Sequence, residues 1–315
     1  MEINFNEDEE IWDKFVEASP QGNIFVYSKF LDSLNKKYNL VTCYDNNKII
    51  AGAVILFSEN GEPLDSVHPF TQYQGILLSD NSHLKIHSKI SSEFKVLEFF
   101  IQELVRYYKK FCFCQSWKLD DMRPFQWHNY HEPEKGLFNI NLRYTAILDL
   151  SSYDSFEEYL TFIRTVRRQE FKKSNANLNL KEIRDENILN YLHEKTFQRQ
   201  GVTRNNEEIS LVKSITKVAI DNGYGKLLCS YQNDIPTSSI LFLYDKSTAY
   251  YLFAANDPEY RNTFSGNFVL LNLIKDAFER KVNEIDFVGA NSPKRADYKI
   301  SYNAVLKPYF ITSLT

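Results

Sequence analysis

The chain has 315 residues, of which 43% are hydrophobic and 25% charged, and its formal net charge at pH 7 is −4. This composition is that of an ordinary folded protein with one or two domains, and the negative charge argues against a general nucleic-acid binder. No stretch is long and apolar enough for a transmembrane helix. The acidic start MEINFNEDEEIWDKF is unlike a signal peptide, so we expect a cytoplasmic protein.

The cysteines and histidines give no sign of a disulfide framework or a metal site. Three of the four cysteines (Cys43, Cys112, Cys114 and Cys229) lie in strand-like apolar runs, and none forms a CxxC pair. Buried, reduced thiols are the expected state of such residues. The six histidines show no HxxxH or HxH spacing, so we predict no metal.

The first half predicts helices, a strand hairpin, a long helix and a strand, in that order. Residues 8–19 and 28–37 have helical spacing, and residues 41–57 (VTCYDNNKIIAGAVILF) read as two strands joined by a polar turn. The apolar stretch YQGILLS follows. Residues 92–111 then predict an amphipathic helix, and CFCQSW predicts a strand.

The second half repeats this order. A strand begins in NLRYTAILDL, and helices are predicted over residues 155–174, 186–200 and 207–221. Residues 227–243 (LLCSYQNDIPTSSILFL) predict a second hairpin. The strand TAYYLFAAN, the helix SGNFVLLNLIKDAFERK and the strand EIDFVGA complete the half. The two hairpins align at a constant offset that matches Cys43 with Cys229. We therefore predict two copies of one α/β unit, residues 1–143 and 144–315.

Several of these stretches resemble the FemAB-like branch of the GNAT acyltransferases. They are GNIFVYSKFLDSL, HPFTQYQGILL, the arginine-rich FIRTVRRQEFKKSNAN, and the closing segment with EIDFVGAN and YKISYNA. The resemblance implies two GNAT-like domains in tandem, each with a mixed sheet flanked by helices. It also implies transfer of an acyl group from acyl-CoA to an amine, with no permanently bound cofactor.

The resemblance places the acyl-CoA site on the turn RNTFSGN of the second unit. Ser265 is a good helix N-cap, and Gly266 and Asn267 expose N–H groups at the positive end of a helix, where a pyrophosphate can bind. Arg261 can add a charge-assisted contact. A plain capped helix is the other interpretation. Of the family's usual glycine-rich turn, Gly266 alone is kept, and the first half has no comparable turn, so we expect its copy to have lost cofactor binding.

The remaining cofactor and catalytic candidates lie close to this turn in the sequence. We expect the strand with Phe253, Ala254 and Ala255 to line the pantetheine arm, and we place Asn291 with the cofactor site. Tyr298 or Tyr302, four residues apart, can protonate the leaving thiolate. Asp286 and His68 are candidates for accepting the proton of the amine, although a turn aspartate and a structural histidine are the plainer interpretations.

The acceptor is expected between the two units. Its candidate ligands are Gln72, Tyr73 and Gln74 in HPFTQYQGILL, and Trp117 and Asp120 in the aromatic loop SWKLDDMRPFQWHNYH. Two cations complete the set. Lys299 can meet a phosphate, and Arg168 lies on a helical row with Arg164 and Lys172, which is otherwise a solvated charged face.

The sequence thus predicts a CoA-dependent N-acyltransferase acting on a small amine. For the acceptor we favour an amino sugar carried on a nucleotide diphosphate and used for surface polysaccharide. An aminoacyl-tRNA-dependent peptidoglycan ligase and a non-catalytic acyl-CoA-binding protein are the alternatives. We expect no DNA partner and no membrane insertion, and a homodimer as the oligomeric state.

Overall fold

The computed structural model describes residues 1–199 and 201–314. Within those residues, no helix combines the length and the apolar character needed to span a membrane. The chain divides into two compact units, Met1–Arg143 with Pro308–Thr315, and Tyr144–Lys307. Gln200 and Thr315, the last residues of a predicted helix and of the predicted second domain, lie outside the described part.

The first unit combines an antiparallel sheet with a long amphipathic helix. The sheet has the order β1-β2-β3-β4, and β5 pairs with β12 at the end of an eight-stranded sheet of the order β5-β12-β6-β11-β10-β9-β8-β7. One face of α3 (Leu97, Phe100, Ile101 and Leu104) is buried in the core cluster of this unit. Its elements are β1 (Glu2–Asn4), α1 (Glu9–Ala18), η1 (Ile24–Val26), α2 (Ser28–Leu31), η2 (Asp32–Leu34), β2 (Tyr38–Asp45), β3 (Lys48–Leu56), β4 (Leu77–Leu78), α3 (Ile86–Tyr108), β5 (Phe111–Cys114), α4 (Arg123–Trp127) and η3 (Pro133–Lys135).

The second unit has a mixed sheet of the order β6-β11-β10-β9-β8-β7, in which β10 and β11 run parallel. The chain passes between the units within β6 and again within β12. The elements from β6 onward are β6 (Phe138–Asp149), α5 (Phe156–Phe162), α6 (Thr165–Asn175), β7 (Asn179–Glu182), α7 (Glu186–Gln198), α8 (Asn206–Asp221), β8 (Gly225–Gln232), β9 (Ile235–Tyr244), β10 (Thr248–Asn256), η4 (Pro258–Thr263), α9 (Ser265–Glu279), β11 (Glu284–Asp286), α10 (Pro293–Ile300) and β12 (Val305–Leu314).

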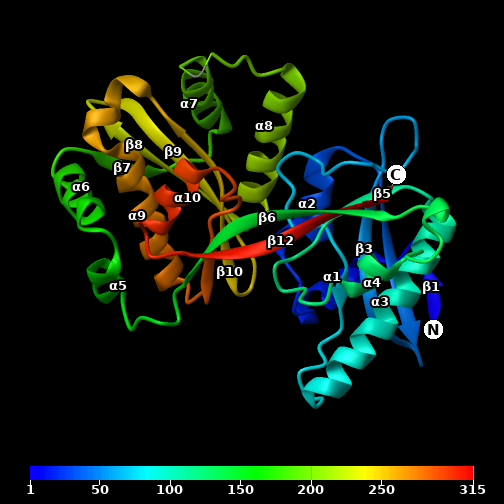
Figure 1. Ribbon diagram of the computed structural model, residues 1–315. Helices are drawn as coiled ribbons and strands as arrows, with labels where there is room; N and C mark the ends of the chain where they lie inside the picture. The colour runs from blue at the N-terminus through cyan, green and yellow to red at the C-terminus, as the bar shows by residue number, and fades with distance from the viewer. Residues whose placement is uncertain (200, 315) are drawn as a thin grey trace. The chain divides into compact units, whose positions relative to one another are not determined.

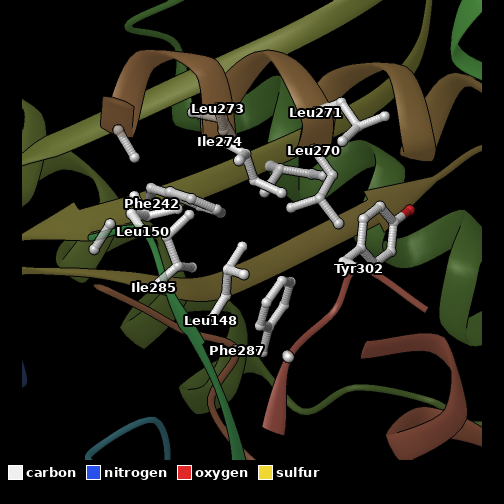
Figure 2. Packing of buried hydrophobic residues seen from close by; sticks show 14 of the residues in the cluster. Leu148, Leu150, Phe242, Leu270, Leu271, Leu273, Ile274, Ile285, Phe287 and Tyr302 are labelled. Carbon is white, nitrogen blue, oxygen red and sulfur yellow. The ribbon is translucent and has the colours of Figure 1, made fainter. Parts of the chain in front are cut away.

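Helices cover both faces of the sheet in the second unit (Figure 1). Alternate residues of β9, Ile240 and Phe242, belong to the core cluster that α9 completes, whereas Leu241 is buried outside that cluster. The helices α7 and α8 contact strands β8–β10 as well. Figure 2 shows Leu270, Leu271 and Ile274 of α9 packed over the strand residues. This packing fixes the start of α9 beside the end of β10.

Both predicted hairpins are present, as β2–β3 and β8–β9. The two central residues of each turn, 46–47 and 233–234, have positive φ values between 47° and 64°. Two left-handed residues in succession give the hairpin turn that matches the strand twist, and asparagine and aspartate tolerate this conformation. Each hairpin also contains a register shift near its turn.

The predicted helix over residues 155–174 is two helices instead of one. Ile163 and Arg164 both have extended backbone angles and separate α5 from α6. Neither glycine nor proline stands at the break, so local propensity does not cause it. Ile163 is buried in the core cluster of this unit, and tertiary packing thus overrides the helical pattern.

Candidate active site

The second unit contains a cavity of about 850 Å³ between the start of α9, the turn η4 and the helices α6, α7 and α10. The predicted Arg261, Ser265, Gly266, Asn267 and Tyr298 all line it. The cavity is therefore the candidate active site.

The helix α9 begins with an N-terminus that no side chain caps. The prediction that Ser265 is the N-cap is wrong: the N-cap is Phe264, which has φ 58° and makes no side-chain cap hydrogen bond. Ser265 is already the first helical residue, and its side chain is buried. The N–H groups of the first turn have no partner within the helix, so they are available to an anion in the cavity.

The turn η4 before α9 is held by a buried carboxylate. Asp257, which is 1% exposed, accepts a hydrogen bond from the N–H of Glu259 and one from Lys195 Nζ at 2.5 Å. This ion pair ties η4 to α7. The turn carries Arg261 to the cavity wall, and Arg167 and the α7 C-cap residue Arg199 line the same cavity. Three arginines and the positive end of α9 therefore border one space.

Gly266 lets the end of β10 approach α9 closely. A Cβ atom at this position would lie 2.6 Å from Asn256 Oδ1 and 3.3 Å from its Cγ. The shorter distance is below that of real Cβ contacts, so a larger residue would displace the Asn256 side chain, which is exposed and can move. The space at Gly266 is therefore limited by this side chain and not by a left-handed backbone.

Two tyrosines and an asparagine form a hydrogen-bonded chain at the cavity wall. The Tyr302 hydroxyl lies 2.7 Å from Asn267 Oδ1 and 3.0 Å from the Tyr298 hydroxyl. The Arg167 guanidinium lies over both rings, 4.8 Å from the centre of Tyr298 and 5.6 Å from that of Tyr302. Tyr298 lines the cavity, whereas Tyr302 is completely buried behind it.

Burial decides the protonation state of both phenols. It raises the pKa of Tyr298, although the hydrogen bond with Tyr302 and the charge of Arg167 oppose this effect. The pKa of Tyr302 is raised well above its ordinary value, again mainly by burial. Both residues are therefore neutral phenols at physiological pH, suited to giving a proton and not to accepting one.

The parallel strands β10 and β11 diverge beside this cavity. Their pairing covers Thr248–Tyr250 and Glu284–Asp286, and β10 then continues to Asn256 along β9 alone. The register of β10 shifts between Tyr251 and Phe253. A strand that has lost a neighbour presents N–H and C=O groups on that side, and Tyr251 lines the cavity at this point.

The strand predicted to line the pantetheine arm has its side chains in packing contacts. Phe253 is buried, and its ring centre lies 5.8 Å from that of His193 in α7. Ala255 is fully buried, and Ala254 packs against the core cluster. Only the backbone of these three residues can therefore meet a ligand on the open side of β10.

The other candidates of the second unit have structural partners outside the cavity. The fully buried Asp286 accepts hydrogen bonds from Thr145 Oγ1 at 2.5 Å and the N–H of Val288 at 2.7 Å. This is the turn aspartate of the plainer interpretation. Asn291 Oδ1 accepts from the N–H of Tyr144. Arg168 donates to the carbonyl oxygen of Thr161, and its predicted role in binding substrate gains no cavity contact.

Lys299 was predicted to meet a phosphate, and the structure contradicts this. Its side chain is buried, and Nζ donates to the carbonyl oxygens of Phe287 (2.5 Å), Val288 (2.7 Å) and Gly289. Burial lowers the pKa of Lys299 to about 8. Lys299 therefore anchors the loop that follows β11, where that strand leaves β10.

A second, smaller cavity of about 380 Å³ lies against α7 and α8, and it contains the buried Arg204. Arg204 Nη1 donates to Asn190 Oδ1 at 3.2 Å, but Nε and Nη2 have no hydrogen-bond partner among the described residues. Glu208 Oε1 lies 3.5 Å from Nε. Glu208 is thus an ion-pair partner of Arg204, and Nη2 is the guanidinium nitrogen for which the described residues offer no hydrogen-bond acceptor.

The candidates in the first unit are used mainly in its packing. The buried His68 has its Nδ1 3.0 Å from the carbonyl oxygen of Pro69, and Gln74 donates to the carbonyl oxygen of Phe25. The Tyr73 ring packs on those of Phe25 and Tyr309, and Gln72 Oε1 lies 3.5 Å from the Tyr309 hydroxyl. Trp117 lies beneath the ammonium of Lys118, and Asp120 lines a separate cavity of about 550 Å³.

The side chains of two glutamines accept hydrogen bonds from backbone N–H groups at β4 in the first unit. Gln115 Oε1 accepts from the N–H of Ile76, and Gln21 Oε1 accepts from the N–H of Leu78, both at 3.0 Å. Gly75 allows this approach, because a Cβ there would lie 2.7 Å from the Cα of Gln115. The N–H groups at this position are therefore already satisfied by side chains.

Arg167, Tyr251, Arg199 and Arg204 are among the residues of the two cavities that were not predicted. Arg167 was passed over in favour of Arg168, although it is the member of the pair that turns toward the tyrosines. Tyr251, Arg199 and Arg204 have no motif that marks them. A polar or charged residue within an apolar or helical pattern was the only available signal.

Residues 161–299 match the model of the acetyltransferase (GNAT) domain family. This segment includes the whole cavity wall from Arg167 to Tyr298. Members of this family use acyl-CoA as a co-substrate, and the prediction of a CoA-dependent N-acyltransferase is confirmed at the level of this class. A search of curated protein sequences finds no match.

Three solved structures resemble the chain over nearly its whole length. FemX has a TM-score of 0.67 at 14% identity, with 98% of this chain and 97% of that chain covered. A conserved protein of unknown function from Bacteroides thetaiotaomicron has a TM-score of 0.62 at 12% identity, with both chains fully covered. A tandem GNAT protein from the clavulanic acid biosynthesis pathway has a TM-score of 0.53 at 10% identity, with 100% of this chain and 98% of that chain covered. At these identities the likeness is one of fold, and the predicted tandem GNAT-like α/β fold is confirmed.

Proposed function

We propose that the second unit binds an acyl-CoA in the 850 Å³ cavity and transfers its acyl group to an amine. The observation that carries the proposal is the meeting, in one cavity, of an uncapped helix N-terminus, three arginines and a protonated tyrosine. The CoA pyrophosphate would lie on the N–H groups of the first turn of α9. Arg261 and Arg199 would add charge-assisted contacts.

The open side of β10 would hold the pantetheine arm. Beyond Tyr250 this strand has lost its parallel neighbour, so its backbone groups can bond to the amides of the arm as a further strand would. The buried contacts of Lys299 keep the loop after β11 apart from β10. The divergence of the two strands is therefore built into the fold.

The reaction would proceed by direct attack of the amine on the thioester carbonyl. The new C–N bond forms, the C–S bond breaks, and sulfur takes the electron pair with a proton from Tyr298. The amine gives up one proton in the same reaction, which restores Tyr298. Positioning and electrostatics can supply most of the acceleration, so no nucleophilic side chain is needed. We propose that the reaction takes place in the cytoplasm.

For the acceptor we favour an amino sugar on a nucleotide diphosphate, because of the Arg204 cavity. Arg204 Nη2 has no hydrogen-bond partner among the described residues and could donate to a phosphate. The end of α7 and its C-cap Arg199 border both cavities: Thr196 and Arg199 line the larger one, and Phe197 and Gln198 the smaller one. We propose that one extended anionic molecule contacts both. The first unit would be a GNAT-like domain without a cofactor, since Gln115 and Gln21 occupy its strand N–H groups.

Two alternatives have specific support. The fold likeness to FemX favours the aminoacyl-tRNA-dependent peptidoglycan ligase, in which charged tRNA would take the place of acyl-CoA. The reduced glycine turn, with Gly266 alone, favours a protein that binds acyl-CoA without turnover. In the first alternative the cavity would bind charged tRNA and not acyl-CoA, and in the second it would bind acyl-CoA but release no thiol.

Calorimetry with the full chain separates these functions. We expect acetyl-CoA or a longer acyl-CoA to bind with micromolar affinity, and thiol to be released when UDP-linked amino sugars are added. The variant Arg204→Met should weaken binding of the sugar nucleotide and leave acyl-CoA binding unchanged. Binding without thiol release across the amine panel would favour the non-catalytic alternative. No binding of any acyl-CoA, with binding of aminoacyl-tRNA, would favour the ligase.

A further inference from the structure

We propose that Tyr251 is a further catalytic residue, whose hydroxyl donates a hydrogen bond to the carbonyl oxygen of the bound thioester. The proposal rests on the proposed function, because it concerns the same transfer of an acyl group from acyl-CoA to an amine. The hydrogen bond would become stronger as negative charge develops on that oxygen during the attack. Tyr251 would keep its own proton throughout, so its role differs from the proton transfer proposed for Tyr298.

Tyr251 lies where the strands β10 and β11 separate. The paired part of β10 ends at Tyr250, opposite Asp286, and Tyr251 is the next residue and lines the cavity. At the other end of the open stretch, the side chain of Asn256 lies next to Gly266 at the start of α9. Five residues of strand span about 17 Å, which is of the order of the length of an extended pantetheine arm. A pyrophosphate at the start of α9 would therefore place the thioester near Tyr251.

Two buried aromatic rings hold the Tyr251 ring in place. The centres of the rings of Phe242 and Phe287 lie 5.8 Å and 5.9 Å from it. Both phenylalanines belong to the core cluster shown in Figure 2, and Tyr251 packs against that cluster. These contacts involve only the ring, and a phenylalanine in place of Tyr251 would keep them. Packing thus explains the ring of Tyr251 but not its hydroxyl.

The Tyr251 hydroxyl has its hydrogen available for a ligand. No residue in the described part of the chain forms a hydrogen bond with it. The two other phenols beside the cavity, Tyr298 and Tyr302, are bonded to each other at 3.0 Å. Burial raises the pKa of Tyr251 well above its ordinary value, so the hydroxyl is neutral and can donate. A buried donor without an acceptor is costly unless a ligand supplies one.

The hydrogen bond would act at the step in which charge moves onto oxygen. The amine nitrogen forms a bond to the thioester carbon, and the π electron pair of the carbonyl group moves to its oxygen. When that pair returns, the C–S bond breaks and sulfur takes the bonding pair, as in the proposed reaction. Tyr251 neither gives nor takes a proton in these steps, and no further reactant is needed. A donor already in place at a developing oxyanion lowers the barrier without reorganisation, and it is more effective where the local dielectric is low.

The first test observes the thioester carbonyl group directly and needs no acceptor. Acetyl-CoA labelled with carbon-13 at the carbonyl carbon is bound to the full chain, and its C=O stretch is measured by difference infrared spectroscopy. We expect a lower frequency in the wild type than in Tyr251→Phe, because a donor on the oxygen weakens the C=O bond. The thermal midpoint should not fall in the variant, since the ring contacts remain.

The second test is the rate of thiol release with an amine that supports turnover. Tyr251→Phe should lower kcat about 100-fold, which is the effect of removing one donor from an oxyanion, and should hardly change the KM for acetyl-CoA. The control is Tyr153→Phe, which removes a hydroxyl of the same unit that bonds Asn303 outside the cavity. This control should behave as the wild type in both tests.

Equal carbonyl frequencies in the wild type and in Tyr251→Phe would overturn this inference and leave the proposed function standing. An equal loss of affinity for acetyl-CoA and for free CoA in the variant would overturn it as well. Free CoA has no acyl carbonyl group, so its loss would show a structural role of the hydroxyl. If the wild type binds neither compound, or releases no thiol with any amine, the proposed function and this inference both fail.

Discussion

Replacement of Gly266 by tryptophan should remove acyl-CoA binding and leave the fold intact. The added Cβ would meet Asn256 Oδ1 at 2.6 Å, and because that side chain is exposed it can turn away. The indole would then occupy the space above the first turn of α9, where the pyrophosphate is proposed to lie. We expect the free energy of unfolding to change by less than about 1 kcal/mol, since glycine is itself a poor helix former.

The loss of affinity can be worked from the contacts that the indole would block. The N–H groups of Gly266 and Asn267 would each donate to a charged phosphate, and such a bond contributes about 1.5 kcal/mol or more. Two of them amount to about 3 kcal/mol, which is about a 100-fold weaker binding. Calorimetry with acetyl-CoA measures this, and Lys275→Trp, on the exposed side of the same helix, is the matched control. Unchanged affinity in Gly266→Trp would refute the placement of the pyrophosphate.

Three further predictions concern stability. Burial and the charge of Arg204 lower the pKa of His193 to about 4, so between about pH 6.5 and 4 the unfolded chain binds a proton that the folded chain does not. As the pH is lowered through this range, the free energy of unfolding of the wild type should decrease by up to about 3 kcal/mol more than that of His193→Gln, as measured by urea unfolding. Lys299→Met should lower the free energy of unfolding by about 2 kcal/mol or more, because it leaves loop carbonyl oxygens without a donor. The control Lys294→Met, at an exposed position, should change it hardly at all. Equal thermal midpoints for the two variants would contradict this prediction. Gln115→Leu removes two buried hydrogen bonds and should lower the free energy of unfolding by about 2 kcal/mol without weakening acetyl-CoA binding. If the variant lost both stability and acetyl-CoA affinity, this would be evidence against a cofactor site confined to the second unit.

The hairpins and the long helices could be predicted because their signals are local. The turns at 46–47 and 233–234 consist of asparagine and aspartate, which accept the left-handed backbone that the structure shows there. The helix over residues 265–279 carries an apolar face that the sheet buries. In the same way, Gly266 between a strand and an apolar helix was enough to locate the cavity.

The role of most polar residues could not be predicted, because it depends on which way a side chain turns after the chain has folded. Arg167 and Arg168 are neighbours in the sequence, yet only Arg167 lies over the tyrosines. Lys299 was predicted to bind substrate and Asp286 to accept a proton, and both are instead bonded to the loop that follows β11. The break at Ile163 has no local cause, since it follows from burial of that side chain.

The order in which the ribosome makes the chain gives the strand β12 a further consequence. Residues 308–314 are translated after the whole second unit but belong to the first unit, where β12 pairs with β5 from Ile311 opposite Cys114 to Leu314 opposite Phe111. Leu314 also packs in the core of that unit. The first unit therefore cannot complete its core during synthesis, and it must wait, partly open, until the second unit has emerged. Its exposed β5 edge would be the part of a nascent chain most in need of a chaperone.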